Sequence, residues 1–260
     1  MKLKSLVVAS LLGLSALSGM AQAETLKMGV EAMFPPFESK DANGKLVGFD
    51  IELGDAVCAK LQVKCEWVES SFDGLIPALN ARKFDFINSA MNITEPRAKV
   101  IDFTVPIYNV PSQLVAKKGS PIESNVASLK AHNVTVGVLQ GSAQETYARK
   151  YWQPEGVKVT SYANQDQVFA DLSSGRIETS FQKTPSAVDG FLSKPEGKDF
   201  ALVPGFVEEE HVLGVGTGFG IRKGNTELKE RLDKAIAELK QEGFISELSK
   251  RYFNADWVAK

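Results

Sequence analysis

The stretch SFDGLIPALNARKFDFINSAMNITEPRAKVIDFT (Ser71–Thr104) decides the fold of this 260-residue chain. Within it, Phe84–Ala90 is predicted as an apolar strand that ends in polar residues, and the sequence Thr-Glu-Pro-Arg follows at 94–97. Thr94 suits the N-cap of a helix, the proline is tolerated in a first turn, and the glutamate complements the positive end of the helix dipole. A strand followed at once by a helix start is the local unit of an open α/β sheet.

Arg97 extends this pattern into a candidate binding site. It lies one turn inside the predicted helix and can reach back over the end of the strand. Free N–H groups at a helix start, together with a planar guanidinium, suit a carboxylate. Phe72 precedes a second predicted helix, with Asp73 as its candidate cap. We therefore predict an anion site at this edge of the sheet.

The rest of the chain alternates short apolar runs with amphipathic helical patterns. Further strands are expected at Leu26–Val30, Glu66–Val68, Val134–Leu139 and Ile177–Phe181. Helices are expected at Phe49–Leu61, Leu75–Ala81, Asn164–Leu172 (closed by Gly175), Pro185–Leu192 and about Glu227–Glu242 (followed by Gly243). Such alternation predicts doubly wound α/β lobes.

The N-terminus predicts export. Lys2 and Lys4 precede an apolar run over Leu6–Leu17, and Ala21-Gln22-Ala23 fits a cleavage site, so residues 1–23 are expected to be a secretory signal peptide. No cysteine follows the apolar run, which argues against a lipid anchor, and we expect a soluble mature chain from about Glu24. The full chain has a net charge of −2. Without Lys2 and Lys4 the mature chain is slightly more acidic, which argues against nucleic acid as a partner.

Two cysteines and two histidines limit the covalent and metal chemistry. Cys58 and Cys65 lie close in sequence, and in an oxidising compartment they are most simply a disulfide, with two buried thiols as the alternative. His132 and His211 are far apart and lack the spacing of metal ligands, so both are expected on the surface and no metal site is predicted.

Three further segments carry a family resemblance. FPPFESKDANGKLVGFDIELGDAVCAKL (Phe34–Leu61), VGVLQGSAQETY (Val136–Tyr147) and GVGTGFGIRKG (Gly214–Gly224) join the opening stretch. Together they resemble, in the same order, the periplasmic amino-acid-binding proteins of ABC importers, in particular the lysine/arginine/ornithine and histidine branch. The resemblance covers the chain after the first two dozen residues. The glycines of the last segment do not form a nucleotide-binding G-x-G-x-x-G, because Phe219 takes the last position.

The resemblance implies the architecture. We expect two doubly wound lobes joined by a two-strand hinge, with a ligand cleft between them, as in type II periplasmic binding proteins. Residues 24–110 and 215–260 would form a discontinuous first lobe, and residues 111–214 the second. The chain would cross between lobes near Asn109–Ser112 and return near Gly214–Gly216, and the cleft would close by hinge bending. A periplasmic monomer without a cofactor is implied, with an amino acid or a derivative as ligand and an ABC permease as partner.

The same resemblance implies the ligand site. Its expected residues are Glu31, Phe34, Phe72, Ser89, Ala90, Asn92, Arg97, Leu139, Ser142, Ala143, Gln144 and Lys183. Arg97 would grip an α-carboxylate, helped by Ser89, Ala90 and Ala143. Phe34 and Phe72 would sandwich the ligand's side chain, and Glu31 would meet its distal cation. Leu139, Ser142 and Gln144 would provide the loop and helix start of the second lobe.

Lys183 departs from the family pattern. The corresponding residue is normally an aspartate that binds the α-ammonium, and Asn92 and Ala143 replace supporting hydroxyl residues. Two like charges about 4 Å apart repel by about 4 kcal/mol at an effective dielectric constant near 20. A lysine that faces the cleft would therefore disfavour an unmodified α-amino acid. Alternatively, Lys183 turns to solvent and a neighbour such as Asn92 serves the ammonium.

Three functions follow from these observations. The first is a receptor for a cationic amino acid, arginine above all. The second is a receptor for an N-substituted or dicarboxylic derivative, such as an opine-like arginine, whose extra carboxylate would meet Lys183. The third is an exported enzyme, since some periplasmic dehydratases share this fold and a buried lysine of depressed pKa can act as a base. No nucleophile–base pair or cofactor motif supports the enzyme, and we predict a binding protein.

Overall fold

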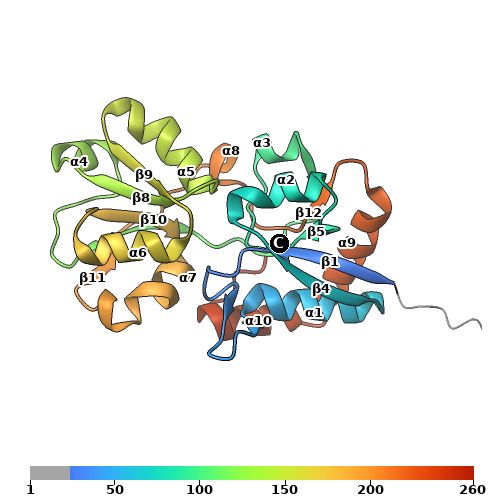
Figure 1. The fold of residues 1–260 in the computed structure, drawn as a ribbon. Coiled ribbons are helices and arrows are strands. Elements are labelled where there is room, and N and C mark those ends of the chain that lie inside the picture. The colour runs from blue at the N-terminus through green and yellow to red at the C-terminus, as the bar shows by residue number, and fades with distance from the viewer. Residues whose placement is uncertain (1–23) are drawn as a thin grey trace, which may run out of the picture.

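The computed structural model describes residues 24–260, which form two α/β lobes side by side (Figure 1). The predicted signal peptide, 1–23, lies outside the described residues. The sheet of the first lobe has the strand order β4 (Lys64–Glu69), β1 (Thr25–Val30), β5 (Phe86–Ile87), β12 (Gly220–Arg222) and β6 (Ile101–Phe103). β1 pairs in parallel with β4 and β5, whereas β12 is antiparallel to β5 and β6. Because β12 comes from late in the chain, the first lobe is discontinuous.

Helices cover both faces of this sheet. They are α1 (Phe49–Leu61), α2 (Leu75–Asn80), α3 (Glu95–Ala98), α9 (Thr226–Gln241) and α10 (Phe244–Phe253). Figure 1 shows α1 and α2 on opposite sides of β1, as expected for a doubly wound lobe. A short hairpin of β2 (Ser39–Lys40) and β3 (Leu46–Val47) precedes α1.

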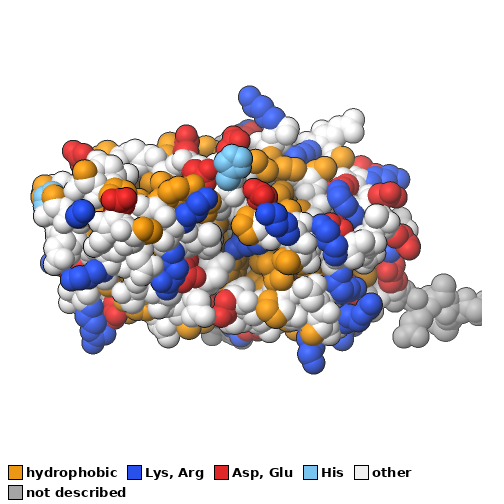
Figure 2. Space-filling view, turned by 90° about the horizontal axis from the view of Figure 1, so that it is seen from above, with side chains coloured by type: hydrophobic (Ala, Val, Ile, Leu, Met, Phe, Trp, Pro, Cys, Tyr) orange, Lys and Arg blue, Asp and Glu red, His pale blue; other side chains and the backbone are white. Residues whose placement is uncertain are grey.

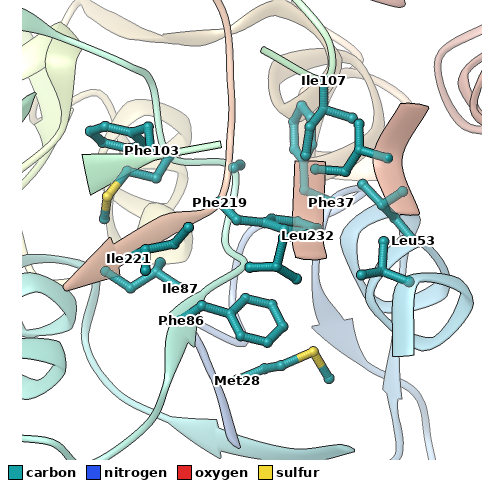
Figure 3. Close-up of a cluster of buried hydrophobic side chains, with 14 of the residues drawn as sticks. Met28, Phe37, Leu53, Phe86, Ile87, Phe103, Ile107, Phe219, Ile221 and Leu232 are labelled. Carbon is teal, nitrogen blue, oxygen red and sulfur yellow. The ribbon is translucent and has the colours of Figure 1, made fainter. Parts of the chain in front are cut away.

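The core of the first lobe lies between this sheet and α9. Met28 and Phe86 lie close to Phe219 and Leu232, whereas Ile87, the next residue of β5, lies beside Ile221 (Figure 3). The predicted apolar face of α9 is confirmed, because its leucines 228, 232 and 239 are all buried. Each large apolar side chain buried in this way contributes roughly 1.5–3 kcal/mol to the stability of the fold. The core therefore stabilises the edge of the sheet that carries the site.

The second lobe repeats the architecture. Its sheet has the order β11 (Phe200–Leu202), β7 (Ser112–Lys117), β10 (Thr179–Lys183), β8 (Thr135–Leu139) and β9 (Lys158–Tyr162). Its helices are α4 (Val126–Ala131), α5 (Ala143–Tyr147), α6 (Gln165–Ser174), α7 (Thr184–Ala187) and α8 (Glu210–Leu213). α5 and α7 each continue as a π-helical turn, over Ala148–Trp152 and Val188–Leu192.

Two crossing segments join the lobes. One runs from the end of β6 to the start of β7, and the other returns after α8 toward β12. They pair with each other, since Thr217 accepts a hydrogen bond from Ile107 (2.7 Å) and its N–H donates to the Tyr108 carbonyl (2.8 Å). The expected two-strand hinge is thus present. We propose that the lobe boundaries lie at 110/111 and 214/215.

Several local predictions are confirmed. Cys58 and Cys65 form a disulfide with Cα atoms 6.1 Å apart, which ties the end of α1 to β4. Asn164 caps α6 by accepting a hydrogen bond from the Gln167 N–H (3.0 Å), and Gly175 ends this helix in a left-handed conformation. His132 is exposed, as is His211.

Other local predictions are wrong in detail. The strand expected over Phe84–Ala90 is reduced to β5, because Ala90 turns to a φ of 44° and its N–H donates to Asp50 instead of a neighbouring strand. Asp73 does not cap a helix: it lies inside a 3₁₀ turn that precedes α2, and its carboxylate accepts from Gln140. The strand expected from Ile177 begins at Thr179.

Candidate functional site

A narrow cavity lies between the lobes and is lined by residues of both. Seen from above, the surface is hollowed where the lobes meet, with hydrophobic and basic side chains in the hollow (Figure 2). The lining residues are Phe34, Phe72, Ala90, Asn92, Leu139, Ser142, Ala143, Gln144, Gln165, Phe181, Gln182 and Lys183. Nine of these are among the predicted site residues, whereas Glu31, Ser89 and Arg97 lie outside the lining.

The aromatic wall belongs to the first lobe. The Phe34 ring stacks on Phe37 with centroids 5.4 Å apart, which fixes its orientation. Phe72 lies at the start of the 3₁₀ turn before α2, and the Arg97 guanidinium lies over its ring at 5.4 Å from the centroid. The two predicted aromatic residues therefore line one cavity, and one of them also supports the predicted anion-binding residue.

Arg97 spans the two lobes beside the cavity. Its Nη1 donates to the Asn92 carbonyl (2.9 Å), and its Nη2 donates to the carbonyl of Gly141 in the second lobe (2.9 Å). Burial lowers the pKa of Arg97 to about 10, so the side chain stays charged at neutral pH. Thr94 takes the predicted N-cap position of α3 but makes no side-chain cap hydrogen bond.

A second contact across the cleft lies next to Arg97. Gln140 Nε2 donates to Asp73 Oδ2 (2.8 Å). Gly141 has a φ of 75°, and a Cβ atom there would come within 2.9 Å of the Asp73 Cα. Glycine is therefore required at this position for the lobes to approach as closely as they do.

Ser89 and Glu31 are joined to a buried network of the first lobe. The Ser89 hydroxyl accepts from the Glu31 N–H (3.0 Å) and donates to Glu38 Oε1 (2.7 Å). Burial raises the pKa of Glu31 to about 7, and its Oε2 has no hydrogen-bond partner in the described part of the chain. The roles predicted for these two residues toward a ligand stay predictions.

Two buried carboxyl groups of this network were not predicted as part of the site. Asp50 accepts from the Ala90 N–H (2.5 Å) and from the Tyr108 hydroxyl (3.1 Å). Burial raises the pKa of Asp50 to about 6, and burial together with the neighbouring Asp50 charge raises the pKa of Glu38 well above its ordinary value. Acidic residues at the start of an amphipathic helix and before a turn usually face solvent, so sequence gave no signal of this network.

Lys183 ends β10 in the wall of the cavity. Only 3% of it is exposed, and its Nζ donates to the Thr217 hydroxyl in the hinge (3.1 Å). Burial lowers the pKa of Lys183 to about 7, and the nearby Arg97 charge lowers it further, while Asp50 and Glu38 oppose the shift. The lysine thus faces the cleft rather than solvent, and it is partly neutral at physiological pH.

The rest of the second-lobe wall surrounds the start of α5. Ser142 caps this helix by accepting from the Glu145 N–H (2.9 Å), and Gln144 Nε2 donates to the Ser112 hydroxyl (2.8 Å). Leu139 and Ala143 add apolar surface. These predicted residues come together because β8 ends where α5 begins.

Gln165, Phe181 and Gln182 line the cavity but were not predicted. Gln182 Nε2 donates to the Gln113 carbonyl (3.1 Å), which leaves Gln182 Oε1 unpaired. Gln165 is the residue directly after the Asn164 cap. A polar residue after a cap is ordinary in sequence, and only the approach of the lobes shows that it is buried.

Two classes of feature are absent from the described part of the chain. No group of three or more His, Cys, Asp or Glu side chains in residues 24–260 could hold a metal ion. None of the helices in that range has the length and hydrophobicity of a membrane span.

Comparison with known proteins agrees with this geometry. The model of bacterial extracellular solute-binding proteins, family 3, matches residues 26–255. The chain is 46% identical to the lysine/arginine/ornithine-binding periplasmic protein of Escherichia coli K12, over 98% of each chain. It is 44% identical to the histidine-binding periplasmic protein of Salmonella typhimurium, over 90% of this chain and 89% of that one. The solved structure of an ancestral arginine-binding protein bound to arginine matches with a TM-score of 0.81 at 38% identity, covering 88% of this chain and 98% of the other. This chain therefore belongs to family 3 of the bacterial extracellular solute-binding proteins.

Proposed function

We propose that this protein captures a cationic, arginine-like amino acid in the periplasm and delivers it to an ABC importer. The single observation that carries the proposal is the half-buried Arg97, which stays charged and spans both lobes at the edge of an aromatic-walled cavity. The relatives with the same architecture bind lysine, arginine, ornithine or histidine according to their names. The predicted signal peptide over 1–23 and the periplasmic relatives support the location, and the permease is part of the proposal.

The proposed binding mode assigns one end of the ligand to each charged group. Arg97 exchanges the Asn92 carbonyl for the α-carboxylate, which is a stronger charge-assisted acceptor. Phe34 and Phe72 hold the aliphatic part of the side chain between their rings. Glu31 becomes ionised and accepts from the distal cation. Closure of the lobes over the ligand places Arg97 against Gly141 and Gln140 against Asp73, as in the present structure.

Lys183 favours a second candidate, an N-substituted or dicarboxylic derivative of such an amino acid. When protonated, the lysine repels an α-ammonium but attracts an additional carboxylate. Its burial in the cavity wall supports this candidate. The unmodified amino acid is also compatible with a Lys183 pKa of about 7, because a neutral amine can accept a hydrogen bond from an α-ammonium.

We propose binding rather than catalysis, because the relatives that share most of the sequence are named as binding proteins. An enzyme on this scaffold would need Lys183 as its base. Incubation with each bound ligand, followed by mass spectrometry, is expected to return the ligand unchanged.

Calorimetry on the mature protein tests the proposal. Arginine, lysine, ornithine, histidine and N-carboxyethyl arginine are titrated separately at neutral pH. We expect micromolar or tighter binding of at least one ligand with a cationic side chain, corresponding to about 8 kcal/mol or more. Binding of neutral or acidic amino acids in preference to all five would overturn the proposal.

A further inference from the structure

Gln165 is a buried amide without a hydrogen-bond partner. Only 1% of the residue is exposed, and neither its Oε1 nor its Nε2 makes a hydrogen bond to another residue of 24–260. It lines the cavity together with Phe34 and Leu139. Leaving a buried amide group unpaired costs about 1–3 kcal/mol, so the side chain is unfavourable for folding alone.

The local fold does not require this side chain. Asn164 already caps α6, a helix of ten residues, through the Gln167 N–H. The other buried residues of α6 are Val168, Phe169 and Leu172, which pack in the core of the second lobe. An apolar residue at 165 would fit the same helix and could be buried equally well. The helix and the core therefore do not explain why an amide is present.

The start of α6 faces the first lobe near Glu31. Asp166, directly after Gln165, lines an outer groove together with Ala32 and Met33, directly after Glu31. The Asp166 charge is also close enough to contribute to the raised pKa of the Glu31 carboxyl. Glu31 Oε2 is itself buried and unpaired. Two unpaired polar side chains, one from each lobe, therefore flank the same end of the cleft.

We propose that Gln165 is a specificity-determining residue that accepts an N–H from the distal group of the ligand, opposite Glu31. The inference rests on the proposed function and names the part of the ligand that the second lobe recognises. A guanidinium suits it best, because its planar fork of N–H donors reaches two acceptors on different sides at once. Asp166 in the first turn offsets the positive end of the α6 dipole, so a cation is tolerated there.

This assignment makes closure of the cleft depend on the distal group of the ligand. The distal group touches the first lobe through Glu31 and the second through Gln165, so a ligand satisfies both only when the cleft is closed and its side chain is long enough. A ligand without distal N–H donors leaves the Gln165 acceptor unpaired, and such sites reject analogues strongly. Gln165 then selects for side chains that end in several donors.

The test uses three variants of the mature protein with arginine as the probe. Gln165→Met keeps the approximate volume and removes the acceptor; Gln165→Glu keeps an acceptor. Gln167→Met is the matched control, because Gln167 is exposed on the same helix. We expect Gln165→Met to weaken arginine binding at least tenfold while raising the melting temperature of the ligand-free protein by about 2–4 °C, because it removes an unpaired buried amide. Gln165→Glu should bind arginine at least as well as wild type, and Gln167→Met should change neither property.

Three results would overturn the inference. The first is unchanged arginine affinity in Gln165→Met. The second is an equal loss in the Met and Glu variants, which would indicate a role in shape rather than in accepting a hydrogen bond. The third is a lower melting temperature in ligand-free Gln165→Met, which would show that Gln165 is a stabilising core residue. By contrast, failure of the wild type to bind arginine, lysine or ornithine counts against the proposed function, and the melting comparison still decides the role of Gln165.

Discussion

The two lobes present different kinds of wall to the cavity. On the first lobe, most polar groups near the site are bonded to one another, as Ser89 is to Glu38 and Asp50 is to Tyr108, and only one carboxylate oxygen each of Glu31 and Glu38 is unpaired among the described residues. On the second lobe, Gln165 and Gln182 carry unpaired amide atoms into the lining, and Lys183 is held only by a hydroxyl of the hinge. A satisfied network is rigid, whereas unpaired groups gain most when a ligand supplies their partners.

This difference assigns ligand capture to the first lobe and ligand selection to the second. The first lobe offers a preformed aromatic platform, which suits any ligand with a carboxylate and a long side chain. The second lobe adds groups whose hydrogen-bonding capacity is unused, so its closure depends on which atoms the ligand presents. Variation among related receptors in ligand preference is then expected to reside in second-lobe residues such as Lys183 and Gln165.

Lys183→Asp should have the largest effect on this comparison. It replaces a cation beside the expected α-ammonium with an anion, and the new attraction is worth up to about 4 kcal/mol at an effective dielectric constant near 20. Arginine affinity measured by calorimetry should rise by up to about a thousandfold, while affinity for N-carboxyethyl arginine falls. The control Lys183→Met removes the cation without adding an anion and should give a smaller gain. Tight arginine binding that neither variant changes would show that Lys183 does not act on the ammonium, and the modified-ligand candidate would be dropped.

Arg97→Ala should have the second largest effect on affinity. It tests the contact to the carboxylate that all candidate ligands share. Loss of a bidentate charged interaction should cost at least 2–3 kcal/mol, so every carboxylate ligand should bind about a hundredfold more weakly or not at all. Because Arg97 also donates to Gly141 across the cleft, small-angle scattering should show a more open ligand-free population. Arg97→Lys is the control: it keeps the charge but not the planar fork. A folded Arg97→Ala variant with wild-type affinity contradicts the site assignment.

Sequence predicted the scaffold of the site better than its chemistry. The pattern of β8 into α5, and the positions of Phe34, Phe72 and Arg97, follow from local signals and from family resemblance. The burial of Glu38, Asp50 and Gln165 and the partner of Lys183 depend on contacts between segments far apart in the chain. Hydrophobic periodicity carries no information on such contacts, because a polar residue in a pattern is read as facing solvent.

Reduction of the Cys58–Cys65 disulfide should lower the stability of the folded protein without changing its ligand affinity. Closing so short a loop stabilises the folded chain by roughly 2–3 kcal/mol on the chain-entropy model. The bridge ties α1 to β4 within the first lobe, away from the cavity lining. Cys58→Ser with Cys65→Ser should therefore lower the melting temperature by about 4–12 °C and leave arginine affinity within twofold. Thiol labelling of the denatured wild type should find no free thiol, and two labelled cysteines without reductant would contradict the disulfide.

The pH dependence of binding distinguishes ligands by the charge they bring to Lys183. Burial lowers the pKa of Lys183 to about 7, and a bound α-ammonium would lower it further, so binding arginine releases a proton below pH 7. Ionisation of Glu31, also with a pKa of about 7, by a distal cation releases another. Arginine affinity should therefore rise with pH up to about 7 and level off above, by up to tenfold per pH unit for each proton released.

N-carboxyethyl arginine should show a weaker rise, because its additional carboxylate stabilises protonated Lys183 and cancels part of the Glu31 effect. Calorimetry in buffers of different ionisation enthalpy counts the protons directly. Lys183→Met should remove the difference between the two ligands. Equal pH profiles for both ligands in the wild type would mean that neither senses the charge of Lys183.

Asn164→Ala should have the smallest effect and tests how firmly the second-lobe wall is held. The Asn164 side chain accepts from the Gln167 N–H, and loss of such a cap costs about 1 kcal/mol. We expect a fall of about 2–4 °C in melting temperature. If the position of Gln165 depends on this cap, arginine affinity should fall by several-fold at the same time, whereas Asn164→Asp, which keeps the cap, should preserve both properties.

Asn225 provides the matched control in the first lobe, because it caps α9 through the Leu228 N–H. Asn225→Ala should lower stability by a similar amount and leave affinity unchanged, and equal losses of affinity in both alanine variants would show that the cleft responds to global stability rather than to the start of α6.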